Sequence, residues 1–91
     1  MLKSVRHRAL KRAVRGDRSS LPPEHATRIV RILRELDIAI TPQDMALPGY
    51  RLHALKGELA GYWSVRVSAN WRILFRMEDG DVFDVDLTDY H

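Results

Sequence analysis

The chain contains no cysteine among its 91 residues. A disulfide framework, a thiolate metal site and a cysteine nucleophile are therefore excluded, and the absence suits the reducing cytoplasm. Glycine and proline are sparse, at five and four residues, and they form neither a glycine-rich phosphate loop nor a low-complexity segment. The apolar run of roughly 20 residues that a membrane span needs is also missing, and the first residues lack the apolar core of a signal peptide. We therefore expect one cytoplasmic domain, residues 1–91, with no membrane segment.

Positive charge is concentrated in the first half of the chain. Residues 1–51 hold 11 Lys or Arg and 5 Asp or Glu, a net charge of +6, whereas residues 52–91 hold 4 and 7, a net charge of −3. Lysine and arginine supply most of the sequence-independent affinity of a protein for nucleic acid. The basic half therefore favours a polyanionic partner such as RNA or the ribosome, the alternative being a small basic domain whose charge has no function.

The first half of the sequence has the apolar periodicity of helices. In residues 24–37 the apolar side chains recur every three or four positions and form one stripe, which predicts a helix of about four turns. Residues 7–15 predict a shorter helix, and residues 41–44 have the capping pattern of one further helical turn. Residues 2–5 predict a short N-terminal strand.

The periodicity changes to that of strands in the second half. Residues 62–67, 71–77 and 82–87 predict three strands separated by short turns, which is the pattern of an antiparallel meander. The apolar face of such a sheet must be covered. We therefore predict an α+β fold in which two N-terminal helices pack on one face of a small antiparallel sheet, formed by the three C-terminal strands and the short N-terminal strand.

Polar side chains suited to proton transfer come at two places in the second half. Asp89, Tyr90 and His91 follow the last predicted strand and offer an acceptor, a donor and a proton carrier that works near neutral pH. His53 and Lys56 lie just before residues 58–60, which two glycines bracket, as is typical of a loop that approaches a ligand closely. For both of these residues the alternative is an ordinary solvated side chain.

Arginine and tryptophan recur on the predicted strands. Arg66 lies on one strand, and Arg72 and Arg76 share a face of the next. A basic row suits a phosphate, but it is equally typical of a solvent face with cross-strand ion pairs. We expect Trp63 and Trp71 in the core, the alternative being platforms on which bases stack.

The sequence predicts no metal site. The four histidines, at positions 7, 25, 53 and 91, lack ligand spacing. Asp84, Asp86 and Asp89 offer the oxygen ligands that a hard cation prefers, but a solvated acidic strand face explains them better.

Four motifs follow one another in the second half of the chain. They are LPGYRLHALKG at residues 47–57, GYWSVRV at 61–67, NWRI at 70–73, and a closing pair, DVD and DYH, at 84–86 and 89–91. The sequence PEHA also opens the long predicted helix. Together these motifs resemble the HigB toxins, which belong to the RelE-like superfamily of type II toxin–antitoxin systems. The resemblance spans nearly the whole chain, and only residues 1–22 match by general character alone.

This resemblance implies a RelE-like α+β endoribonuclease that enters the ribosomal A site, cuts mRNA there without metal or cofactor, and stops translation. It also implies a HigA-like helix-turn-helix antitoxin, which inhibits the toxin and through which the pair binds operator DNA. The catalytic positions that the resemblance implies are His53, Asp89, Tyr90 and His91. Two basic positions near that site correspond to Lys56 and Arg72.

The chemistry of metal-free RNA cleavage fits these residues. The 2′-hydroxyl attacks the adjacent phosphate, so one group must accept its proton and another must protonate the 5′-oxygen, while cations offset the growing charge. We expect the two histidines to share the acid–base work, with Asp89 orienting a histidine or acting as base. Tyr90 would donate a hydrogen bond or position the base or phosphate. Lys56 and Arg72 would hold the phosphate.

Three other classes of protein stay open at this point. A non-catalytic RNA-binding or ribosome-binding domain would protect mRNA without cutting it, and a structural partner of a DNA-binding protein would cause no growth arrest. A metal-dependent nuclease would lose activity in excess chelator. From charge alone, we expect the first helix to contact ribosomal RNA through Lys11, Arg12 and Arg15.

Overall fold

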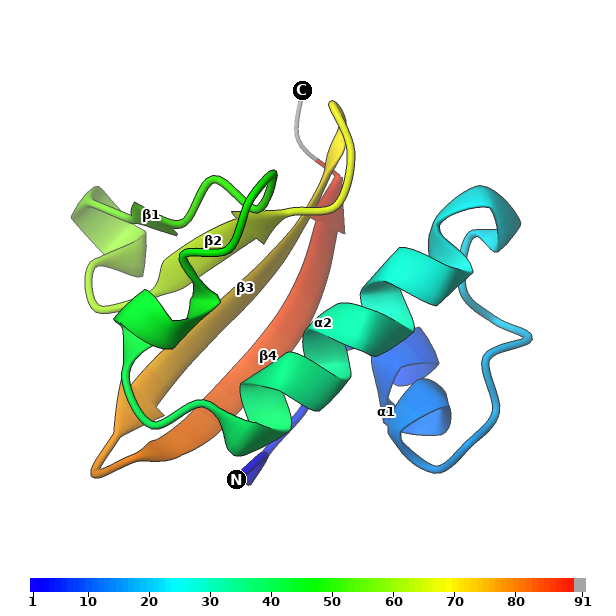
Figure 1. The fold of residues 1–91 in the computed structure, drawn as a ribbon, viewed down its shortest axis with the longest axis horizontal. Helices are drawn as coiled ribbons and strands as arrows, with labels where there is room; N and C mark the ends of the chain where they lie inside the picture. The colour runs from blue at the N-terminus through cyan, green and yellow to red at the C-terminus, as the bar shows by residue number, and fades with distance from the viewer. Residues whose placement is uncertain (90–91) are drawn as a thin grey trace.

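The computed structural model describes residues 1–89 as an α+β domain (Figure 1). The two α-helices and four strands are, in chain order, α1 Arg8–Val14, α2 Ala26–Ile38, β1 His53–Ala54, β2 Trp63–Arg66, β3 Trp71–Glu78 and β4 Asp81–Asp89. Three short 3₁₀ helices lie between them, η1 Pro23–His25, η2 Pro42–Met45 and η3 Gly57–Leu59. No helix in this described part is long and apolar enough to cross a membrane.

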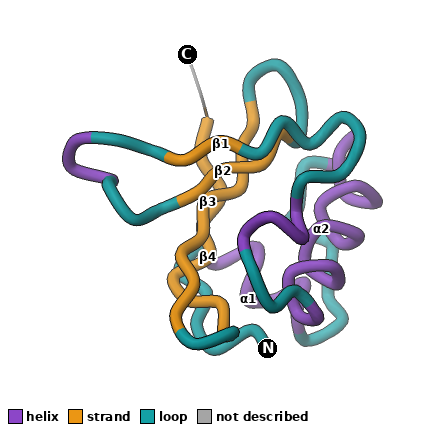
Figure 2. The backbone as a smooth tube through the Cα atoms, turned by 60° about the vertical axis from the view of Figure 1, so that its left-hand side comes forward, coloured by secondary structure: helices purple, strands orange, loops and turns teal. Residues whose placement is uncertain are grey.

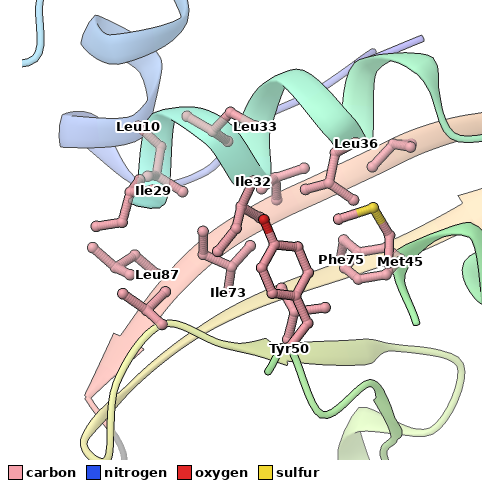
Figure 3. Close-up of a cluster of buried hydrophobic side chains, with 14 of the residues drawn as sticks. Leu10, Ile29, Ile32, Leu33, Leu36, Met45, Tyr50, Ile73, Phe75 and Leu87 are labelled. Atoms are coloured by element: carbon pink, nitrogen blue, oxygen red, sulfur yellow. The ribbon is translucent and has the colours of Figure 1, made fainter. Parts of the chain in front are cut away.

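The strands form one antiparallel sheet in the order β1-β2-β3-β4, with both α-helices on the same side of it (Figure 2). Val65, Ile73 and Leu87 are cross-strand neighbours, and all three are buried. The apolar stripe of α2 packs onto this row, with Ile29 and Ile32 fully buried (Figure 3). The predicted α+β fold, with two helices on one sheet face, is therefore confirmed.

The N-terminal segment is shorter than a strand. Leu2 and Val5 form isolated parallel bridges to Val82 and Val85 of β4, so the predicted N-terminal strand is present only as two bridges. Backbone hydrogen bonds hold the segment along the free edge of β4, among them one of 2.8 Å from the Lys3 N–H to the Val82 carbonyl. The segment thereby covers part of an edge that would otherwise be open to pairing.

A bulge interrupts the ladder between β3 and β4. Leu74 pairs with Asp86 and Arg76 with Phe83, so Phe75 faces two residues of β4 instead of one. Asp84 takes a left-handed conformation there, with φ of 53°. A bulge shifts by one residue the alternation of buried and exposed side chains along a strand. The buried residues of β4 are Val82, Val85 and Leu87, so they are three apart across the bulge and two apart after it.

Tyr50 fixes the chain between the helices and the sheet. Its side chain is 1% exposed and reaches toward α2 (Figure 3), where its hydroxyl donates a hydrogen bond of 3.1 Å to Glu35 Oε1. Its carbonyl accepts a 2.6 Å hydrogen bond from the Arg66 N–H of β2. Strand β1 begins three residues later and adds a fourth strand that the sequence did not predict.

Candidate active site

The sheet face turned away from the helices carries a hollow of about 460 Å³, here called the open-face hollow. It draws side chains from all four strands and from the segments that flank β1. Its lining residues are Arg51, His53, Leu55, Leu59, Ser64, Arg72, Leu74 and Thr88. The volume lies in the range of small-molecule sites, and basic, hydroxyl and apolar groups meet in it.

Strand register explains why these residues meet. His53 of β1 lies opposite Ser64 of β2, and Ser64 lies opposite Leu74 of β3. In the next row, Arg72 of β3 lies opposite Thr88 of β4. Directly paired residues point to the same face, and alternate residues point to opposite faces. Because Val65 and its row face the helices, these two rows face away from them.

Two of the predicted site residues come together in the hollow. His53 is exposed on β1, and Arg72 is half-buried on β3. Both line the open-face hollow although 18 intervening residues separate them in the chain. A proton carrier and a guanidinium that line the same concave surface are two kinds of group suited to phosphodiester cleavage.

The other predicted residues lie at the margin of the hollow or beyond the described part. Lys56 is exposed directly before η3, next to Leu55 of the lining. Asp89 ends β4 and follows Thr88 of the lining, but it pairs with Trp71, so strand alternation places it on the opposite face of the sheet from Thr88 and Arg72. The predictions for residues 90 and 91, the tyrosine and histidine of the closing motif, lie outside the described residues.

The hollow also contains residues that the sequence did not single out. Leu55, Leu59 and Leu74 give it an apolar wall, and Leu59 is 44% exposed. Arg51 adds a second guanidinium. The sequence held a signal for Arg51, which is that Arg51 and His53 alternate with the apolar residues Tyr50 and Leu52. In the structure Tyr50 and Leu52 pack with the core, whereas Arg51 and His53 are exposed.

Basic residues face each other beside the hollow. Arg66 of β2 lies directly opposite Arg72 of β3. Like charges in directly opposed positions destabilise a sheet unless other groups offset them. The predicted basic row therefore has two parts. Arg76, farther along β3, forms ion pairs, whereas Arg66 and Arg72 place positive charge near the hollow that His53 lines.

Asp84 belongs to a different part of the open face. It accepts a 2.8 Å hydrogen bond from Arg76 Nε, and this bond is the largest cause of an Asp84 pKa below its ordinary value. Its second oxygen accepts from Ser4 Oγ at 3.4 Å. Within residues 1–89, no three His, Asp or Glu side chains gather closely enough to hold a metal ion. Asp84 thus stabilises the bulge through these hydrogen bonds.

The two tryptophans pack against the core, as predicted. Trp63 and Trp71 are half-buried and pack against the buried cluster. Trp63 also lies opposite Phe75, a fully buried residue of the helix-facing side. This packing fits the predicted core role, and part of each side chain stays exposed.

Comparison with known proteins identifies the family. Residues 3–91 match the model of the HigB-like toxins, described as RelE-like toxins of type II toxin–antitoxin systems. The chain is 39% identical to Endoribonuclease HigB of Proteus vulgaris in an alignment of 92 positions that covers 100% of both proteins. It is 34% identical to Toxin HigB-1 of Vibrio cholerae over 61 residues, 66% of this chain and 64% of that protein.

Solved structures share the fold. The toxin–antitoxin complex YoeB-YefM of Staphylococcus aureus superposes with a TM-score of 0.63 at 17% identity, covering 100% of this chain and 98% of that one. The YoeB/ParE toxin of Agrobacterium tumefaciens gives a TM-score of 0.63 at 22% identity, covering 99% and 96%. The family match over residues 3–91 and the 39% identity to Endoribonuclease HigB show that the chain belongs to the HigB-like family of RelE-like toxins of type II toxin–antitoxin systems.

Proposed function

We propose that this toxin is an endoribonuclease that cuts mRNA in the ribosomal A site and thereby inhibits translation in the cytoplasm. The observation that carries the proposal is the meeting of His53 and Arg72 in the open-face hollow. The name of the Proteus vulgaris relative, Endoribonuclease HigB, supports the reaction class. The positive net charge of +3 suits a polyanionic substrate and the ribosome.

The proposed reaction needs no metal. The 2′-oxygen of a ribose attacks the adjacent phosphorus while the bond from phosphorus to the 5′-oxygen breaks. The proton leaves the 2′-hydroxyl for a base, and an acid gives a proton to the departing 5′-oxygen. The products are a 2′,3′-cyclic phosphate and a 5′-hydroxyl, so every atom and proton is accounted for.

The proposed roles follow the chemistry of each side chain. His53 shares the acid–base work with His91, because an imidazole changes charge near neutral pH. Asp89 orients one imidazole or acts as base, and Tyr90 donates a hydrogen bond to the substrate.

The phosphate contacts come from the basic residues around the hollow. Arg72 holds two phosphate oxygens through paired N–H donors, and Lys56 contributes a point charge at the rim. The leucine wall shields one side of the hollow from water, which strengthens these charge interactions in the transition state. The sugar and base of the substrate nucleotide can lie against that wall.

The proposed protein partner is an antitoxin. Membership of a type II toxin family implies one, and a structure that shares this fold is a toxin–antitoxin complex. We propose a HigA-like protein with a helix-turn-helix fold, through which the pair would bind operator DNA. The toxin itself would touch DNA only through this partner.

The proposal is tested by incubating mRNA with the toxin in the presence and absence of programmed ribosomes. We expect cutting only on ribosomes, and loss of cutting when His91 is deleted. Ribosomes need Mg²⁺ for their own integrity, so the ends of the products report the mechanism better than chelation does. Protection of mRNA without cutting would instead favour a non-catalytic RNA-binding domain, and cutting that leaves a 5′-phosphate would favour a metal-activated water.

A further inference from the structure

Arg51 has a backbone conformation that favours glycine. Its φ is 47°, in the left-handed region that carries a steric cost for any residue with a Cβ atom. Two residues earlier, Gly49 adopts φ of 83° without that cost. The chain nevertheless keeps a large charged side chain at position 51. Strained residues of this kind cluster at functional sites, so the side chain itself needs an explanation.

The neighbours of Arg51 hold the strained backbone in place. Tyr50 is buried on one side, and its N–H donates a 3.0 Å hydrogen bond to the Leu47 carbonyl. The Tyr50 carbonyl is bound by the Arg66 N–H at 2.6 Å. Leu52 packs against the core on the other side. With both neighbours fixed, the turn at position 51 is imposed by the fold, and the Arg51 side chain lines the open-face hollow beside His53.

Arg51 also adds charge where positive charge is already dense. Arg51 and Arg72 both line the hollow, and Arg66 lies opposite Arg72 at its edge. Two guanidiniums thus line one apolar-walled hollow, and paired N–H donors of this kind suit an anion with several oxygens.

We propose that Arg51 is a second RNA-phosphate-binding residue, which holds the backbone of single-stranded RNA in the open-face hollow alongside Arg72. The ligand class is a phosphodiester chain, because the hollow combines guanidiniums at its rim with a leucine wall that suits a ribose and base. This inference rests on the proposed function, and it adds a residue for which neither the sequence motifs nor the family match specifies a role. Arg51 binds substrate, whereas His53 transfers protons.

The test measures how tightly the toxin binds an RNA oligonucleotide that it cannot cut, with 2′-O-methyl groups at every ribose, at several salt concentrations. Arg51→Gly and wild type are compared by fluorescence anisotropy. We expect Arg51→Gly to weaken binding about three- to tenfold at low salt, to a similar degree for different sequences. The slope of log affinity against log salt should become shallower by about 0.7, the amount for one lost phosphate contact to a single strand.

A second readout separates binding from folding. Because glycine accepts the left-handed conformation without strain, Arg51→Gly should melt at the same or a higher temperature than wild type. Arg51→Lys keeps the charge but loses the paired donors, so it should bind with intermediate affinity. The matched control is Arg34→Ala, which removes one exposed arginine from α2, on the helical side of the sheet, and should leave the salt slope unchanged.

The outcomes distinguish this inference from the proposed function. If the wild type cleaves mRNA on ribosomes but Arg51→Gly binds the oligonucleotide with unchanged affinity and salt slope, the role of Arg51 is overturned and the proposed nuclease is not. If the wild type binds the oligonucleotide but cleaves no mRNA, and Arg51→Gly has a shallower salt slope, the RNA contact of Arg51 is upheld and the proposed nuclease activity is overturned. Failure of the wild type to bind the oligonucleotide would overturn the inference.

Discussion

Arg76 of β3 and Asp84 of β4 are joined by a hydrogen bond of 2.8 Å from Arg76 Nε to Asp84 Oδ2. The bond crosses the bulge, because Arg76 pairs with Phe83 and Asp84 is the residue of positive φ beside it. Ser4 Oγ accepts a 2.8 Å hydrogen bond from the Asp84 N–H. The N-terminal segment and β3 therefore hold the bulge from two sides, and the bulge sets which face the rest of β4 presents to the open-face hollow.

The Arg76–Asp84 pair predicts a pH-dependent stability. The hydrogen bond from Arg76 holds the pKa of Asp84 below its ordinary value of 3.8, so the carboxylate contributes stability above that pH and loses it as the pH falls through the lowered pKa. Asp84→Asn keeps a residue that tolerates positive φ but removes the charge. We expect it to lower the melting temperature by a few degrees at pH 7.

Thermal melts at pH 7 and near pH 2 check this prediction. The gap between wild type and Asp84→Asn should shrink as the wild-type carboxylate is protonated. A gap of equal size at both pH values would show that the effect comes from side-chain shape and not from charge.

Tyr50 predicts a stability effect at the junction of helix and sheet. Tyr50→Phe removes the donor to Glu35 Oε1 but keeps the buried ring, so we expect the free energy of unfolding to fall by about 1 kcal/mol. Glu35 retains a 3.0 Å bond from Arg31 Nε. Urea denaturation measures the change, with Tyr62→Phe as control, because the Tyr62 hydroxyl lies 3.4 Å from Asp84 Oδ2 and should contribute less. Equal losses for the two variants would refute this account of Tyr50.

The leucine wall predicts an effect on substrate binding without one on folding. Leu59 lines the open-face hollow and is 44% exposed, so Leu59→Ser should raise KM several-fold while changing the melting temperature little. Ile38→Ser is the matched control, since Ile38 is 78% exposed at the end of α2. Steady-state cleavage of mRNA on ribosomes measures both. Similar kinetics for the two variants would show that the leucine wall does not contribute to substrate binding.

The sequence was most informative where burial follows a period. The stripe that includes Ile29 and Leu33 predicted α2, and alternation predicted β2 and β3, because each of these elements has one buried face. By contrast, β1 has two residues that are both exposed, so no period marks it. The bulge at Asp84 depends on a left-handed residue and on contacts with Ser4, 80 positions away.

The site was predictable in its chemistry more than in its shape. His53 and Arg72 were singled out by residue type and motif, and the register of three strands places them in one hollow. Arg51 and Leu59 were not singled out, because an arginine and a leucine have ordinary roles on most surfaces. Their place in the hollow follows from the turn after Tyr50 and from η3, which tertiary packing determines.

The proposed chemistry predicts a dependence on the 2′-hydroxyl. An mRNA with a single 2′-deoxyribose immediately 5′ of the mapped cut should resist wild-type toxin at that position, because the attacking oxygen is absent. A deoxyribose three nucleotides away serves as control and should be tolerated. Sequencing gels of ribosome-bound mRNA measure both. Undiminished cutting at the deoxy position would exclude attack by the 2′-oxygen.

RNA should be cut in the open-face hollow, and the decisive measurement is single-turnover cleavage of ribosome-bound mRNA by His53→Gln. His25→Gln is the control, since His25 lies at the start of α2, outside the hollow. Because general acid–base catalysis contributes about 10²- to 10⁴-fold, His53→Gln should be at least 100-fold slower than wild type while melting at a similar temperature, and His25→Gln should cut at the wild-type rate. A folded His53→Gln protein that cuts as fast as wild type would contradict the account.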